Sequence, residues 1–370
     1  MVVQRTGWSV ALVSTAVTLH FLVGAAVVAN LPRLYRRTSV PVITFTGAVL
    51  LAIGVVGWSV ANQPWHLFIS ALLSGMGWVG MGAAAVNAII APWFVRNRPA
   101  ALSMAYNGAS VGGVIFSPLW IALIVWSGFA QAAIVIGISM IITVAVLSVL
   151  VFSKSPEGLG QFPDGAPSDQ IASLTPPLVT VPLPSGTLWN DRRFITLTVG
   201  MAAGLFAQIG LLAHLFSIMA PVFGTQTTGV LMGGATVAAI AGRTGIGWLM
   251  PASADRRLIA SASYGVQIIG SLALLWAGGE NTASMIIGVL LFGLGIGNAT
   301  SLPPLIAQVE FHKADVPRVV PLIVAMSQAT YALAPALFGI VRTMSDPAVF
   351  VLAVAMQCFA VASFLYGRHQ

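Results

Sequence analysis

The chain has 370 residues, of which 58% are hydrophobic and 7% are charged, and its formal net charge is +7. A soluble core could not bury so much apolar surface, so the composition excludes an ordinary soluble protein and indicates a protein of the lipid bilayer. The basic residues are scattered between apolar stretches, which excludes a nucleic-acid surface, and the single cysteine excludes an internal disulfide.

Apolar runs of helical length follow one another along the chain, separated by short polar breaks. Each run is long enough to cross a bilayer as an α-helix. We predict eleven spans, at residues 8–30, 41–61, 66–91, 100–126, 130–152, 194–220, 228–250, 258–277, 283–306, 319–341 and 347–366. The sequence therefore predicts an all-α polytopic membrane protein.

Charges in the breaks predict the orientation of these spans. One side would collect thirteen basic residues, Arg33, Arg36, Arg37, Arg96, Arg98, Lys154, Arg192, Arg193, Arg256, Arg257, Lys313, Arg318 and Arg368. The other side would carry only Arg5 and Arg342. Because cytoplasmic loops are enriched in Lys and Arg, we predict a multi-pass protein of the cell membrane with its C-terminus in the cytoplasm.

One break is longer than the others and divides the chain into two halves. Residues 154–192 are rich in proline and lack sustained periodicity, which predicts a cytoplasmic linker. We therefore predict a helix bundle over residues 1–153 with five spans and a second over residues 193–370 with six. Gly75 and Gly77 recur as Gly293 and Gly295. Such weak internal symmetry is typical of transporters whose substrate site lies between two repeats.

A single charge, Arg243, lies inside the predicted spans. Placing an arginine there costs roughly 2.5–3.5 kcal/mol, so a function is the default interpretation. A buried guanidinium presents a planar fork of donors to a carboxylate, which predicts a small organic anion as substrate. The alternative is an anchor, because Arg243 lies only about 10 Å from the basic end of its helix and could extend toward that end.

Eight further side chains inside the spans are candidates for binding the substrate. They are His20, Tyr106, Asn107, Gln208, His214, Asn298, Gln328 and Tyr331. Each could equally bond a neighbouring helix. No acidic residue lies inside a predicted span, so a coupled proton would depend on His20 or His214.

Three stretches resemble a known family. They are GRTGIGWL with the following DRR, the run WFVRNRPAALSMAYNGASVGGVIFSPL, and SPEGLGQFPDG at the start of the linker. These stretches resemble the major facilitator superfamily, and most of all its monocarboxylate porter and oxalate/formate antiporter branches. The resemblance implies two helix bundles, secondary active transport by alternating access, a monomer and no cofactor or metal. It also implies that Arg243 matches the family's helix-eight arginine, which binds substrate carboxylate.

The resemblance also assigns two loops to gating, through Arg33, Arg36, Arg37, Asp255, Arg256 and Arg257. The acidic position of the family's signature loop is lost in both copies, being Arg36 in the first and Pro251 in the second. The segment that precedes the family's second helix precedes the first span here, at residues 7–9. We therefore predict helices two to twelve of a twelve-helix pattern, either because the start site lies further upstream or because the product is shortened.

Other functions remain as alternatives. The chain could export drugs or other metabolites, as a related branch of the superfamily does, or act as a substrate sensor on the same scaffold. An enzyme is not expected, because the chain has no HExxH motif and its one GxSxG match, residues 108–112, lies inside an apolar helical span without a preceding strand.

Overall fold

The computed structural model describes residues 2–165, 187–251 and 253–368. Helices are joined by turns and loops in these ranges, and no β-strand is found in them. Within these ranges, ten helices are long and apolar enough to cross a membrane. They are Leu12–Arg37, Val40–Val60, Pro64–Ile90, Arg98–Ser127, Phe129–Phe152, Arg192–Gly224, Gln226–Leu249, Arg256–Ala277, Val316–Arg342 and Asp346–Tyr366. The predicted all-α membrane architecture is confirmed.

The chain forms two compact units. Unit 1 comprises Met1–Arg98 and Val111–Ser173, and unit 2 comprises Pro99–Ser110 and Leu174–Gln370. Helix α6 (Arg98–Ser127) therefore contributes residues to both. The boundaries at residues 153 and 193 stay a prediction, and residues 166–186 of the predicted linker lie outside the described part of the chain.

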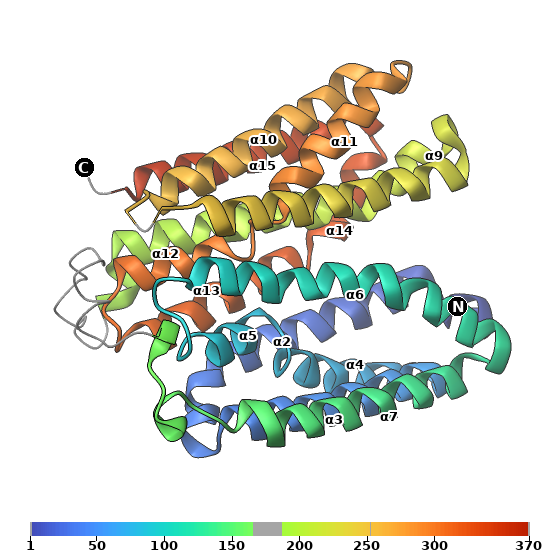
Figure 1. The fold of residues 1–370 in the computed structure, drawn as a ribbon. Coiled ribbons are helices and arrows are strands. Elements are labelled where there is room, and N and C mark those ends of the chain that lie inside the picture. Colours follow the sequence, from blue (N-terminus) through green and yellow to red (C-terminus); the bar gives the residue numbers. More distant parts are fainter. Residues whose placement is uncertain (1, 166–186, 252, 369–370) are drawn as a thin grey trace. The chain divides into compact units, whose positions relative to one another are not determined.

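Unit 1 is a bundle of long apolar helices. Its elements are α1 (Val2–Thr6), α2 (Val10–Arg37), α3 (Val40–Val60), α4 (Pro64–Val79), α5 (Ala83–Ile90), the second part of α6, and α7 (Phe129–Leu147), which continues into a π-helical turn, Ser148–Phe152. Helix α3 packs against α4 and α7, and α4 also packs against α2 (Figure 1). A Cβ at Gly77 would lie 2.3 Å from the Leu51 nitrogen, so glycine permits the close approach of α3 and α4.

Unit 2 is built around α9 (Arg192–Leu249). The other elements are α10 (Arg256–Ala277), α11 (Thr282–Ile296), α12 (Leu302–Glu310), α13 (Val316–Tyr331), α14 (Ala334–Arg342) and α15 (Asp346–Tyr366). Helix α9 contains both predicted spans, interrupted at Gly224 with φ 77° and ψ 160°, a conformation that favours glycine (Figure 1). Its first part packs into a core with Val289, Phe292 and Phe338.

The predicted span 283–306 is wrong as a continuous helix. Helix α11 ends at Ile296, and α12 begins at Leu302 after a turn. Pro303 and Pro304 lack the backbone N–H that a continuing helix requires, and their rings would clash with the preceding turn. In unit 1 a shorter turn separates α4 from α5, inside the apolar stretch Pro64–Ile90 that counts as one span above. Such a break leaves carbonyl groups free for partners outside the helix.

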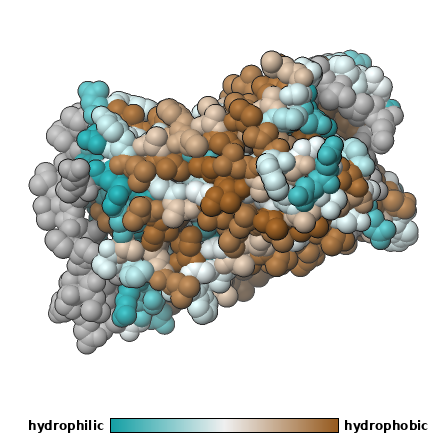
Figure 2. Space-filling model, turned by 90° about the horizontal axis from the view of Figure 1, so that it is seen from above, coloured by the Kyte–Doolittle hydropathy of each residue, from teal (hydrophilic) through white to brown (hydrophobic). Residues whose placement is uncertain are grey.

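Large apolar side chains cover much of the surface, as Figure 2 shows for one face. In α6, Val125 and Trp126 are 81% and 84% exposed. An exposed apolar surface of this kind on a soluble monomer would promote association, whereas in a bilayer it contacts lipid chains instead of water. The surface therefore agrees with the membrane assignment.

The start of the predicted linker folds back onto the loop between α5 and α6. The Asp164 carboxylate accepts hydrogen bonds from the backbone N–H groups of Val95, Arg96 and Asn97, at 2.9, 2.7 and 3.2 Å. The Asp164 backbone N–H donates to the Trp93 carbonyl at 3.0 Å, with Asp164 in the left-handed region at φ 57°. One carboxylate thus holds the linker against unit 1.

Asp164→Ala is expected to release this loop and so speed tryptic cleavage after Arg96, whose side chain is already exposed. Three acceptor contacts disappear, and each is worth about 0.5–1.5 kcal/mol net, so cleavage at Arg96 should accelerate about tenfold or more. Glu157→Ala is the matched control, because Glu157 is an exposed acidic residue of the same segment. Equal cleavage rates for the two variants would contradict a role for Asp164 in holding the loop.

Candidate functional site

Arg243 is buried in unit 2, with 8% of its surface exposed. Its Nε donates to the Gly297 carbonyl at 2.5 Å, and its Nη1 donates to Asn107 Oδ1 at 3.1 Å. The first acceptor lies in the turn between α11 and α12, and the second lies in the part of α6 that belongs to unit 2. The guanidinium is therefore held inside the unit, which favours a buried site over an anchor at the end of α9.

The positive charge of Arg243 has no acidic partner in the described part of the chain. The ion pairs there join Asp191 with Arg193, Arg257 with Glu310, Arg342 with Asp346 and Arg368 with Asp255. Both acceptors of Arg243 are neutral oxygens, and its Nη2 makes no hydrogen bond to a described residue. A buried cation without a counter-charge is costly, and an entering anion would neutralise it.

Two further hydrogen bonds join α6 to this turn of α9. Asn107 Nδ2 donates to Thr244 Oγ1 at 2.7 Å, and Ser103 Oγ donates to the Arg243 carbonyl at 2.6 Å. The approach requires Gly247, because a Cβ there would lie 2.5 Å from the Ser103 Cβ. Sequence reasoning missed Ser103, Thr244 and Gly297, since single hydroxyl groups and a glycine carbonyl carry no distinctive pattern.

The other predicted site residues of unit 2 lie outside the hydrogen bonds of Arg243. Asn298 follows Gly297 but donates to Ser263 Oγ at 3.2 Å, on α10. His214 Nε2 contacts the Pro335 carbonyl at 2.9 Å, so it joins α9 to α14. Tyr106 is buried on α6, Gln208 on α9 and Gln328 on α13, while Tyr331, the last residue of α13, is half-buried. Their roles in substrate binding stay predictions.

His20 lies in unit 1 and belongs to a separate polar cluster. Its Nδ1 lies 2.8 Å from Ser74 Oγ, which also accepts from Trp58 Nε1 at 3.1 Å. Through these bonds a single serine on α4 joins α2 to α3. The structure therefore gives His20 a bonding role between helices, and a role in carrying protons stays a prediction.

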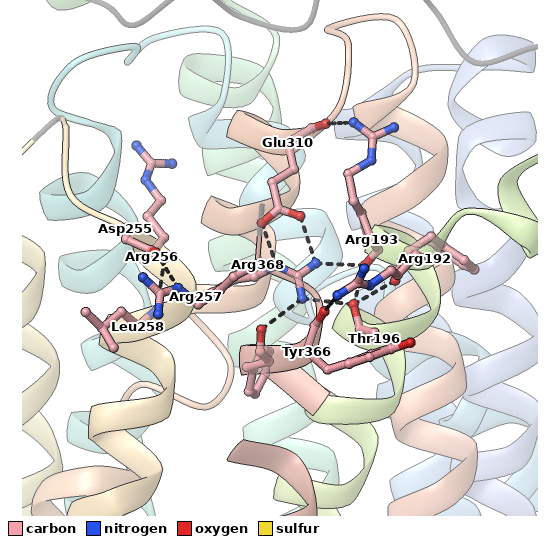
Figure 3. Close-up of polar contacts among 12 residues, drawn as sticks. Arg192, Arg193, Thr196, Asp255, Arg256, Arg257, Leu258, Glu310, Tyr366 and Arg368 are labelled. Carbon is pink, nitrogen blue, oxygen red and sulfur yellow. Dashed lines mark hydrogen bonds and ion pairs between the residues drawn. The ribbon is translucent and has the colours of Figure 1, made fainter. Parts of the chain in front are cut away.

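The predicted gating residue Arg257 is at the centre of a bonded cluster at one end of unit 2 (Figure 3). Arg257 is 1% exposed and forms a bidentate pair with Glu310, with Nε–Oε1 at 2.6 Å and Nη2–Oε2 at 2.8 Å. It also donates to Thr196 Oγ1 at 2.9 Å and to the Phe364 carbonyl at 3.4 Å. One side chain thus ties α9, α10, α12 and α15 together.

The neighbouring charges extend this cluster (Figure 3). Arg193 Nη1 donates to the Glu310 carbonyl at 2.8 Å, and Asp255 pairs with Arg368 at 2.7 Å. Arg256 Nη1 donates to the Leu305 carbonyl at 2.5 Å. In unit 1, the predicted gating residues Arg33, Arg36 and Arg37 lie at the end of α2, where Arg33 bonds Asn30 Oδ1 at 2.9 Å. Gating by either group stays a prediction.

Two carboxylates in this region cap helices and have lowered pKa values. Burial opposes ionisation of Asp191, but its bonds with Arg193 and with the N–H groups of Arg193 and Phe194 outweigh burial, so its pKa lies below the usual 3.8. The pKa of Asp255 is likewise lowered. Burial raises it, but the hydrogen bond from the Leu258 N–H and the bond and charge of Arg368 together lower it by more. Both side chains therefore stabilise the fold in their ionised form.

This stabilisation is expected to be lost in acid. Because the folded-state pKa values are lower than the unfolded ones, the contribution is complete above about pH 4 and disappears as the pH falls through the folded values. The apparent midpoint temperature of thermal unfolding of the detergent-solubilised protein should drop over that range. Asp191→Asn should lower the midpoint at pH 6 and flatten its decline below pH 4, and an unchanged decline would contradict the assignment.

Comparison with known proteins agrees with this architecture. The sequence model of the Major Facilitator Superfamily matches residues 1–335. The MFS transporter asaE of Aspergillus flavus is 26% identical over 286 residues, which make up 75% of this chain and 59% of that relative. The chain therefore spans less than two thirds of the length of this relative.

Solved structures of low sequence identity share the fold. The E. coli fucose:proton symporter FucP superposes with a TM-score of 0.68 at 13% identity, covering 97% of this chain and 91% of that one. The human organic anion transporter MFSD10 gives a TM-score of 0.66 at 12% identity, with coverages of 96% and 83%. The family match, the apolar helices and the shared fold lead to one conclusion: this multi-pass membrane chain belongs to the Major Facilitator Superfamily.

Proposed function

We propose that this protein is a secondary active transporter that moves small organic anions by alternating access. Monocarboxylates are the proposed substrate class. The observation that carries this proposal is the buried charge of Arg243, which bonds only neutral oxygens among the described residues. A carboxylate supplies the missing counter-charge and accepts from Nη2. In a water-poor site such a charge-assisted contact is stronger than in water.

Further features of the proposal follow from the sequence. The monocarboxylate porter and oxalate/formate antiporter branches are the proposed relatives, and the cell membrane is the proposed location, with the linker and C-terminus in the cytoplasm. A monomer of two bundles would open the site alternately to each side. A coupled proton would be carried by His20 or His214.

Transport by the purified chain in proteoliposomes tests this function. Radiolabelled formate, L-lactate, pyruvate and oxalate would be offered with and without an imposed pH gradient. We expect saturable uptake of at least one monocarboxylate and its counterflow against unlabelled anion. Uptake of uncharged or cationic compounds alone would favour the drug or metabolite exporter, whereas anion binding without counterflow would favour a sensor.

A further inference from the structure

Asn107 and Ser103 both bond Arg243, and Asn107 also bonds Thr244. We propose that Asn107, oriented by Thr244, is a neutral brace that holds the Arg243 guanidinium in place and leaves its charge for the substrate anion. The inference rests on the proposed function for its transport consequences, but the brace itself has consequences for stability that need no substrate. The sequence leaves open whether Asn107 contacts the substrate or bonds a neighbouring helix, and the bonds to α9 carry the inference.

The two ends of the Asn107 amide are bonded to consecutive residues of α9. Thr244 Oγ1 accepts from Nδ2 at 2.7 Å, so Oδ1 is left to face Arg243 Nη1, at 3.1 Å. A threonine hydroxyl can accept this bond, whereas a valine of the same shape cannot. Thr244 is therefore a positioning residue that acts on Arg243 through Asn107.

A third bond fixes the register between the two helices. Ser103 lies one turn before Asn107 on α6 and donates to the Arg243 backbone carbonyl at 2.6 Å. The same turn of α9 is thus bonded at the backbone of Arg243 and at the side chains of both Arg243 and Thr244. With Nε on the Gly297 carbonyl, the guanidinium is held from two sides, and Nη2 is available to a ligand.

The neutrality of the brace matters as much as its shape. Asparagine and aspartate have nearly the same size, but an aspartate at this position would form an ion pair with Arg243 and neutralise it. A substrate carboxylate would then have to displace a tethered carboxylate, and its affinity would fall. The neutral amide makes Asn107 a determinant of selectivity for anions.

The decisive variant is Asn107→Asp, which should shift affinity and stability in opposite directions. We expect KM for the transported monocarboxylate to rise about a hundredfold, since a charged competitor replaces a neutral acceptor. We also expect the apparent unfolding midpoint without substrate to rise by several degrees, because the buried cation gains a counter-charge. A merely damaged fold would lower the midpoint instead.

Thr244→Val tests the positioning role. We expect about a tenfold rise in KM, which corresponds to about 1.4 kcal/mol, with the maximal rate within about twofold of wild type. Thr244→Ser should restore KM because it restores the hydroxyl. The matched control is Thr236→Val, on the same helix, whose hydroxyl donates only to the Met232 carbonyl of its own helix at 3.1 Å and should leave KM unchanged.

The outcomes separate the brace from the proposed function. If wild-type protein transports no anion, the proposed function fails, yet a raised midpoint for Asn107→Asp still supports the brace. If wild-type protein transports a monocarboxylate but Asn107→Asp lowers the midpoint, or Thr244→Val and Thr236→Val give the same KM, the brace is overturned while the transporter stands.

Discussion

Arg243→Ala is expected to abolish saturable monocarboxylate uptake while the protein still inserts and unfolds cooperatively. The variant removes the only charge inside the predicted spans, which is also the group that we propose binds the substrate carboxylate. A charge-assisted contact of this kind in a water-poor site contributes several kcal/mol, so a loss of about a hundredfold or more in kcat/KM is expected. Because the buried charge is costly in the empty protein, the unfolding midpoint should not fall as far as it does for an ordinary core truncation.

Arg243→Lys separates the charge from the planar fork. Lysine keeps a cation but lacks the planar guanidinium that Gly297 and Asn107 orient, so we expect part of the affinity to remain and selectivity among carboxylates to weaken. Arg342→Ala is the matched control, because Arg342 lies in the same unit and forms an exposed pair with Asp346. Equal uptake by Arg243→Ala and Arg342→Ala would reduce Arg243 to a structural residue and remove the main support for an anion transporter.

Glu310→Ala is expected to destabilise unit 2 strongly. It leaves Arg257, which is 1% exposed, without its carboxylate partner. The three other acceptors of Arg257 are a hydroxyl and two backbone carbonyls, which are neutral and cannot balance its charge. Removing one partner of a buried ion pair costs about 3–5 kcal/mol. The apparent unfolding midpoint should therefore drop by about ten degrees, at about 2–4 °C per kcal/mol for a unit of this size.

Two variants control this prediction. Asp346→Ala breaks the exposed pair of Arg342 and Asp346 and should cost about 0–1 kcal/mol, because water screens that pair. Glu310→Gln keeps hydrogen-bonding capacity without the charge and should fall between the two. A midpoint for Glu310→Ala equal to that of Asp346→Ala would show that the buried pair contributes no more than a surface pair.

The hydrophobic pattern is sufficient to predict the membrane class and most helices of this chain. Apolar runs of about 20 residues have few alternatives to a spanning helix, because lipid cannot satisfy exposed backbone groups. The lone charge at Arg243 also stands out against such runs without any structure. Both inferences rest on properties of a single segment, and such properties can be read from the residues in order.

The features missed by the sequence depend on contacts between segments far apart. Periodicity continues across Gly297 to Pro304, so it predicted a single span where the proline pair and the close approach to Ala239 divide two helices. The pairing of Arg257 with Glu310 joins residues 53 positions apart, and nothing in either neighbourhood indicates the other.

The sequence by itself therefore determined that this is a helical membrane protein with one charge, Arg243, inside its predicted spans. Only the tertiary structure decided that this charge is buried and what surrounds it, namely a neutral amide from α6 and a carbonyl freed by a broken helix. The physical reason is that burial depends on local composition, which neighbouring residues share, whereas hydrogen-bond geometry depends on which helices meet and in what register.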